Sequence, residues 1–75
     1  MEKYKNLSGN SGVESFEIGE DFIRIKFQKV EAPYIYNHQN PGRKKVEKMK
    51  VLAQTGKGLS TYISQEVKDS YYSNV

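Results

Sequence analysis

A group of cations near the middle of the chain contains the residues best suited to bind a ligand. From position 43 to 57 the sequence has six basic residues and a single acidic one, Glu47. Such an excess of one charge can present a positive face to a polyanion, although a basic helix face is often simply solvated. The candidates for phosphate contact in this segment are Arg43, Lys44, Lys48 and Lys50.

The turn Gly56-Lys57-Gly58 follows these cations and precedes a second helical pattern. Free N–H groups at a helix start carry partial positive charge, and glycines let the backbone approach an oxyanion closely. The spacing differs from that of a P-loop, which requires G-x-x-x-x-G-K-[ST] after a strand. We therefore exclude an ATPase and keep two compatible interpretations, a helix-to-helix connector and a turn that also touches phosphate.

No residue pattern predicts catalysis or metal binding. The sequence has no cysteine and one histidine, His38, which excludes thiolate and multi-histidine metal sites. His38 and Ser60 lack the spacing of a catalytic triad, and the carboxylates are scattered over strands and turns. We expect a non-enzymatic protein with no catalytic residue, no metal and no cofactor.

Two strands precede the cations and form a predicted hairpin around the turn Gly19-Glu20-Asp21. In V-E-S-F-E-I, Phe16 and Ile18 share one face, and F-I-R-I-K-F also alternates. In the second strand Ile23, Ile25 and Phe27 lie on one face. The opposite face is a second candidate binding surface, because it combines an aromatic ring with two cations; its residues are Phe22, Arg24 and Lys26.

A third strand is predicted in P-Y-I-Y-N, where Tyr34 and Tyr36 share a face and Ile35 points the other way. The two tyrosines could form a stacking platform for bases, as aromatic residues do on the sheets of many single-strand binders. Two large rings nevertheless fill a small core better than one isoleucine. We therefore expect Tyr34 and Tyr36 to be buried.

Two helices follow the strands. Asn40 is the predicted N-cap of the first helix, with Pro41 at its first position and Gly56 closing it. Its apolar stripe consists of Val46, Met49, Leu52 and Ala53. Ser60 is the predicted N-cap of a second helix, which extends to about Val67. Three residues spaced by four could dock this helix on the core: Leu59, Ile63 and Val67.

This order of elements predicts an α+β fold, a three-stranded antiparallel β-meander followed by two helices packed on one face (β-β-β-α-α). At 75 residues the chain is long enough for a single core. We expect a flexible N-terminal lead-in over 1–10, one domain over 11–71 and a C-terminal tail over 72–75. No apolar run suits a signal peptide or a membrane span, so we expect a cytoplasmic protein without membrane contact.

The chain resembles the KTSC domain, a short bacterial module also found at the C-terminus of some lysyl-tRNA synthetases. The resemblance covers about residues 11–71 and lies in the hairpin, in Tyr34-Ile35-Tyr36 and in the segment from Gly56 to Ile63. The family pattern there is S-x-G-[KR]-aromatic-F-N-x-x-I. Gly56, Lys57 and Ile63 match it, and Ser60 replaces asparagine as another capping residue. The departures are Gln54 for Ser, Gly58 for the aromatic residue and Leu59 for Phe.

The function of the KTSC family is undetermined, and its attachment to a tRNA synthetase is what implies RNA binding; the cations support the same expectation. Our leading hypothesis is a nucleic-acid-binding accessory domain, with RNA as the expected ligand, that contacts phosphates through the basic helix, Gly56, Lys57 and Gly58. The alternative is a small protein–protein interaction module that docks a partner through an edge strand near Tyr34 or through Phe22. The two hypotheses differ in whether an apolar patch is exposed.

Overall fold

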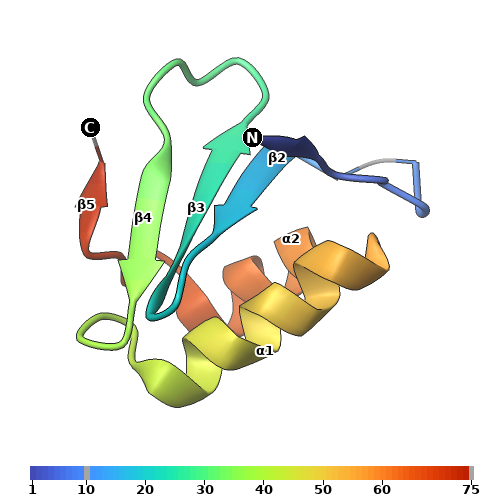
Figure 1. Ribbon diagram of the computed structural model, residues 1–75. Coiled ribbons are helices and arrows are strands. Elements are labelled where there is room, and N and C mark those ends of the chain that lie inside the picture. Colours follow the sequence, from blue (N-terminus) through green and yellow to red (C-terminus); the bar gives the residue numbers. More distant parts are fainter. Residues whose placement is uncertain (10, 75) are drawn as a thin grey trace.

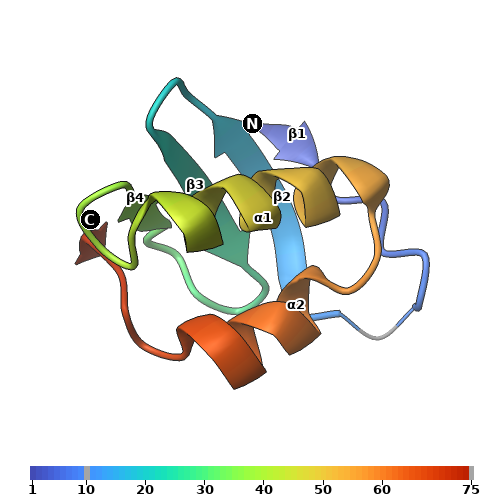
Figure 2. The same cartoon turned by 90° about the horizontal axis from the view of Figure 1, so that it is seen from below.

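The computed structural model describes residues 1–9 and 11–74. Over this part of the chain the fold is α+β, as predicted, but the antiparallel sheet has five strands rather than the predicted three. Both helical segments lie on the same side of the sheet (Figures 1 and 2). In chain order the elements are β1 (Glu2–Lys3), β2 (Val13–Ile18), β3 (Phe22–Phe27), β4 (Tyr34–Asn37), α1 (Arg43–Thr55), α2 (Leu59–Tyr62), η1 (Ile63–Val67, a π-helix) and β5 (Ser73–Asn74).

The central strands bury the face that their alternation predicts. Ile23 and Ile25 of β3 are fully buried, and Phe16 of β2 lies opposite Ile25 in the antiparallel register. The register between β2 and β3 shifts between Val13 and Ser15, which inserts one extra residue into β2. Because of this bulge, Val13 and Phe16 both face the core although they are three positions apart.

The tight β2–β3 connection depends on a glycine. A Cβ atom at Gly19 would come within 1.9 Å of the Phe22 ring, so the ring lies directly over the glycine backbone. The Gly19 N–H donates to the Phe22 carbonyl at 2.9 Å and closes the turn. This contact half-buries Phe22, which we predicted to lie on a surface open to a ligand.

The two short outer strands were not predicted. In β1, Glu2 pairs with Phe16, so residues 2–3 belong to the sheet rather than to a flexible lead-in. In β5, Ser73 pairs with Ile35, so the expected C-terminal tail extends the other edge. Asn10 and Val75, which fell within the predicted lead-in and tail, lie outside the described residues.

Tyr4 joins the N-terminal segment to the second helical segment. Its side chain is 2 % exposed and belongs to the core. Its hydroxyl oxygen accepts a hydrogen bond at 3.3 Å from the N–H of Leu59, the first residue of α2. Its own N–H donates to the Glu14 carbonyl at 3.0 Å. Tyr4 therefore fills the core and satisfies a helix-start donor at the same time.

Helix α1 begins later than predicted. It starts at Arg43 with Gly42 at the N-cap position, so the prediction of Asn40 as cap and Pro41 as first helical residue is wrong. The Asn40 side-chain amide instead donates to the Tyr71 carbonyl at 2.9 Å. At the other end Gly56 closes the helix as predicted, in the left-handed conformation at φ +86°, and its N–H donates to the Leu52 carbonyl.

The second helical segment runs from Leu59 to Val67. Its N-cap is Gly58 rather than the predicted Ser60, and no side chain caps it. The hydrogen bonding widens to the π pattern over η1, which ends where the Lys68 N–H donates to the Ile63 carbonyl. The three predicted docking residues, Leu59, Ile63 and Val67, are all buried, as expected.

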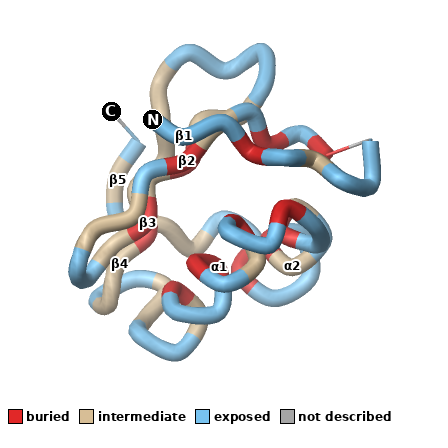
Figure 3. Tube along the Cα trace, turned by 45° about the vertical axis from the view of Figure 1, so that its right-hand side comes forward, coloured by how far each residue is buried: buried red, intermediate tan, exposed pale blue. Residues whose placement is uncertain are grey.

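A single core lies between the sheet and the helices. Figure 3 shows buried segments on the strands opposite buried segments on α1 and α2. The predicted stripe of α1 supplies Val46, Met49 and Ala53, all at most 1 % exposed, while Leu52 lies at its margin. These contacts fix which side of α1 faces the sheet and therefore which side faces solvent.

Replacing Tyr4 tests whether the first residues belong to the domain. We expect Tyr4→Ala to lower the free energy of unfolding by about 3–5 kcal/mol, because it leaves a large cavity. Tyr4→Phe should cost about 1 kcal/mol, since only the hydrogen bond to the Leu59 N–H is lost. Urea denaturation followed by circular dichroism measures both values.

The control for this series is Leu7→Ala. The Leu7 side chain is 64 % exposed, so its truncation should change the free energy of unfolding by about 0.5 kcal/mol or less. Equal effects of Tyr4→Ala and Leu7→Ala would contradict the placement of Tyr4 in the core.

Candidate functional site

Three of the four predicted cations on α1 lie on its solvent side. Arg43, Lys44 and Lys48 are exposed. Lys44 and Lys48 are one helical turn apart, so their side chains are neighbours on the surface that points away from the sheet. Within residues 1–9 and 11–74, none of the three lies within ion-pair distance of an acidic group. Their charges are therefore available to an external anion.

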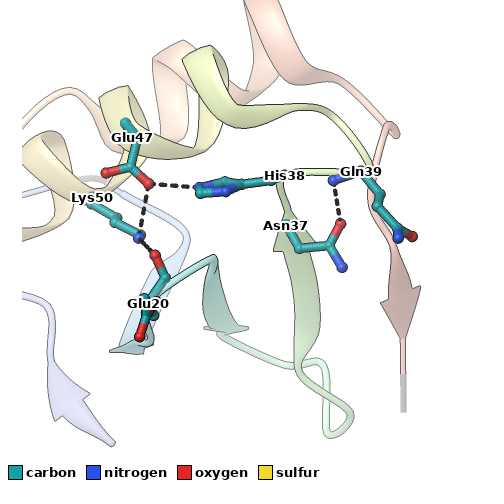
Figure 4. A network of polar contacts seen from close by, with 6 residues as sticks. All are labelled: Glu20, Asn37, His38, Gln39, Glu47 and Lys50. Carbon is teal, nitrogen blue, oxygen red and sulfur yellow. Dashed lines mark hydrogen bonds and ion pairs between the residues drawn. The ribbon is translucent and has the colours of Figure 1, made fainter.

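Lys50 is not part of this surface, which corrects the prediction. It is 9 % exposed and lies on the side of α1 that faces the hairpin turn. Its ammonium donates to the Glu20 carbonyl at 3.0 Å and pairs with the Glu47 carboxylate at 2.9 Å (Figure 4). The charge pattern grouped Lys50 with the cations expected to contact phosphate, whereas these two partners hold it on the buried side of the helix.

Glu47 connects Lys50 to His38. The same carboxylate oxygen, Oε2, lies 2.8 Å from His38 Nε2 (Figure 4). The hydrogen bond from Lys50, and after it the one from His38, holds the pKa of the Glu47 carboxyl below its usual value. The one acidic residue among the α1 cations is thus committed to the protein's own network, which reduces its repulsion of an approaching anion.

The turn between α1 and α2 does not offer the amide cradle considered from the sequence. The Gly56 N–H donates to the Leu52 carbonyl, and the Leu59 N–H donates to the Tyr4 hydroxyl. The side chain of Lys57 remains exposed, as does Gly58. The turn is a helix-to-helix connector that carries a cation, while Gly56 itself is buried.

Lys5 is a cation of this turn that the sequence did not indicate. A Cβ atom at Gly56 would lie 2.6 Å from the Lys5 Cβ, so the Lys5 stem packs directly over the glycine. The Leu7 N–H donates to the Gly56 carbonyl at 2.8 Å and fixes this segment beside the turn. No local pattern relates positions 5 and 56, because the contact arises from the pairing of β1 with the sheet.

The second candidate surface is largely neutralised by acidic residues of β2. Arg24 pairs with Glu17 at 2.9 Å, and Lys26 lies 3.5 Å from Glu14. Phe22 is half-buried against the Gly19 backbone rather than open to a ligand. These contacts leave the outer face of the hairpin with little net attraction for phosphate.

The two tyrosines of the third predicted strand differ in burial. Tyr36 is 2 % exposed, as expected, and burial, followed by the nearby Tyr34 and Tyr71, raises the pKa of its hydroxyl. Tyr34 is only half-buried, which corrects the expectation that both rings fill the core. The Tyr34 ring lies edge-on to Tyr71, with centroids 4.8 Å apart, at the side of a surface pocket.

The pocket at Tyr34 contains residues that the sequence did not single out. The segment between η1 and β5, where we predicted the domain to end, contributes Lys68, Asp69 and Tyr71. Because β5 pairs with β4, that segment lies beside Tyr34. The only sequence signal was the aromatic pair Tyr71-Tyr72, whose docking depends on the unpredicted strand.

The positions of the side chains and strands also bear on metal binding, membrane insertion and docking of a partner at a sheet edge. In the described part of the chain, no group of three potential ligands from His, Cys, Asp and Glu could hold a metal ion. None of the described helices is both long and apolar enough to cross a membrane. For the protein-interaction alternative, β4 is paired on both sides, by β3 and β5, so the strand carrying Tyr34 is not an open edge.

Comparisons with models of known protein families, with curated protein sequences and with solved structures found no match. The similarity to the KTSC domain therefore remains a prediction based on the motifs quoted above.

The lowered pKa of Glu47 predicts a pH-dependent effect of Glu47→Gln. The ionised carboxylate contributes stability above its unfolded pKa, and this contribution is lost as the pH falls through its folded pKa. We expect the wild-type protein to be more stable than Glu47→Gln at about pH 7, with the difference shrinking as the pH falls through the lowered folded pKa of the Glu47 carboxyl. Urea denaturation at a series of pH values measures this difference.

Glu31→Gln is the matched control, because Glu31 is exposed and is in no ion pair within the described residues. Its stability should follow that of the wild type across the series. A Glu47→Gln difference that is independent of pH would contradict the role of the His38–Glu47–Lys50 network.

Proposed function

We propose that this protein is a non-enzymatic nucleic-acid-binding domain that contacts phosphates through the outer side of α1 and the turn after it. The observation that carries the proposal is the exposure of a set of cations that have no acidic partner within residues 1–9 and 11–74. The set, here called the cationic face, consists of Arg43, Lys44, Lys48 and Lys57.

The internal pairing of the other charges supports this choice of surface. Arg24 and Lys26 are paired with carboxylates of β2, and the Lys50 ammonium is held by Glu20 and Glu47. A polyanion would therefore find more unsatisfied positive charge on α1 than on the outer face of the hairpin. A paired cation attracts a phosphate less strongly, because the carboxylate beside it cancels part of its field and repels the same phosphate.

Flexible lysines suit contact with phosphates better than recognition of a base sequence. The Lys44 and Lys48 ammonium groups are point charges on mobile stems, so they follow a backbone without fixing its register. We therefore propose binding with little sequence preference from the cationic face itself. The resemblance to the KTSC domain makes single-stranded RNA the first ligand to test.

The salt dependence of binding tests the proposal. If all four cations of the cationic face contact phosphates of a single strand, log K should fall with log salt concentration with a slope of about −3. The double variant Lys44→Gln/Lys48→Gln should reduce the size of this slope by about 1.4, because two contacts are removed. Fluorescence anisotropy of a labelled single-stranded RNA over a salt series measures both slopes.

Lys26→Gln is the control for each single lysine removed, because it takes one positive charge from the outer face of the sheet, where Lys26 already has Glu14 beside it. It should leave the slope close to that of the wild type. Binding that does not respond to salt, or an equal change in the control, would refute the proposal.

A further inference from the structure

A pocket lies on the helix side of the sheet, between the start of β4 and the segment that follows η1. Its volume of about 360 Å³ is at the lower end of the range for small-molecule sites, enough for one ring system. Phe27, Tyr34, Tyr36 and Tyr71 form its aromatic walls. Tyr34 meets Phe27 and Tyr71 edge to face, with centroids 5.4 and 4.8 Å apart, and lies stacked with Tyr36 at 6.4 Å.

Two opposite charges line the same pocket. Lys68 and Asp69 are both exposed. Neither is in an ion pair within the described part of the chain, although they are adjacent in sequence. The pocket therefore offers an apolar aromatic wall, a cationic donor and an anionic acceptor.

The backbone at the pocket is unusual in two ways. The helical segment ends in the π-helix η1, a form that is rare and frequent at functional sites. The next residue, Lys68, has φ +56° and ψ −126°, a conformation that non-glycine residues seldom adopt. Both features lie in or next to the segment that contains Lys68 and Asp69, the two charged residues of the pocket.

We propose that this pocket binds one unstacked nucleobase of a single-stranded nucleic acid. The base would stack against the aromatic walls, its amino edge would donate to the Asp69 carboxylate, and the phosphate of its nucleotide would meet the Lys68 ammonium. The inference rests on the proposed function, because that function supplies the nucleic acid to which the base belongs. It adds recognition of a base to the phosphate contacts of the cationic face.

The combination of charges distinguishes a nucleotide from other flat ligands. A nucleotide has a planar ring, hydrogen-bond donors on one edge and a negative charge on the sugar side. A phenylalanine of a partner protein would fill the walls but would offer no polar group to either charge, and a tyrosine or tryptophan would offer a donor to Asp69 but no anion to Lys68. Base–aromatic stacking is tolerant of sequence, so the preference should come from Asp69 and favour bases with an amino group.

Two contacts relate the pocket segment to α1 and to the loop that precedes it. The Lys45 ammonium donates to the Glu66 carbonyl in η1 at 2.7 Å, and the Asn40 side chain donates to the Tyr71 carbonyl at 2.9 Å. Figure 2 shows η1 next to α1 and the following segment leading to β5 beside β4. The first turn of α1 and the pocket segment are thus held together, and the proposal has one strand cross both.

Nuclear magnetic resonance with matched ligands tests the inference. A short cytidine oligonucleotide should shift the aromatic resonances of Phe27, Tyr34 and Tyr71, and its abasic counterpart, with the same number of phosphates, should not. Cytidine monophosphate should shift the same resonances more weakly, and ribose phosphate should leave them unchanged. Shifts with the free nucleotide but not with the strand would overturn the assignment to a strand.

Asp69→Ala separates base recognition from simple charge attraction. The substitution removes a negative charge, so a purely electrostatic surface would bind the oligonucleotide more tightly. The proposed contact predicts weaker binding instead, by about tenfold, with a smaller loss for a uridine strand, whose base has no amino group. Tighter or unchanged binding of the cytidine strand would overturn the inference.

Lys44→Gln keeps this test independent of the proposed function. It should weaken binding of the oligonucleotide and of its abasic counterpart alike, without changing the pocket shifts caused by cytidine monophosphate. Salt-dependent binding without pocket shifts would overturn the pocket and leave the cationic face. Pocket shifts by the mononucleotide, together with strand binding that ignores salt, would overturn the cationic face.

Discussion

The position of the Lys50 ammonium constrains how α1 lies on the sheet. It is held by the Glu20 carbonyl and the Glu47 carboxylate, at 3.0 and 2.9 Å, on the mostly buried side of the helix. Turning α1 about its axis would break the contact with the Glu20 carbonyl and would expose Val46, Met49 and Ala53 to water, so the ammonium and the apolar stripe both oppose such a rotation. With Lys50 facing inward, helical geometry directs Lys44 and Lys48 outward. The packing that removes one cation from the surface therefore orients the others.

The outer strands have an equally large effect on the functional surfaces. Strand β1 contains two residues, yet its pairing brings Tyr4 into the core and the Lys5 stem over Gly56. Strand β5, also of two residues, brings Tyr71 to Tyr34. Both ends of the chain thus complete features whose other halves lie far away in the sequence. Neither the α1–α2 turn nor the aromatic pocket would have its present form with the three central strands alone.

The features that could be predicted are those set by residues close together in the sequence. The β2–β3 hairpin and the apolar stripe of α1 could be derived because the burial period is a local property. Residues 2–3 could not be recognised as a strand, since two residues show no period and the pairing partner is Phe16. The burial of Lys50 was equally hidden, because the decisive acceptor is the backbone carbonyl of Glu20. The exposed cations could be predicted because they lie on a helix that the apolar stripe itself predicted.

The difference between Tyr34 and Tyr36 shows why alternation alone misses a pocket. Both rings lie on the same face of β4, and alternation assigns them the same environment. The helices cover only part of that face, whereas the β3–β4 connection extends beyond them (Figure 1). Tyr36 lies under the covered part and is buried, while Tyr34, two residues earlier, lies at its margin. Because the sheet face is longer than the helices that cover it, the ring of Tyr34 is left only partly covered. The segment with Lys68 and Asp69 lies beside this ring and forms a pocket with two charges at its side.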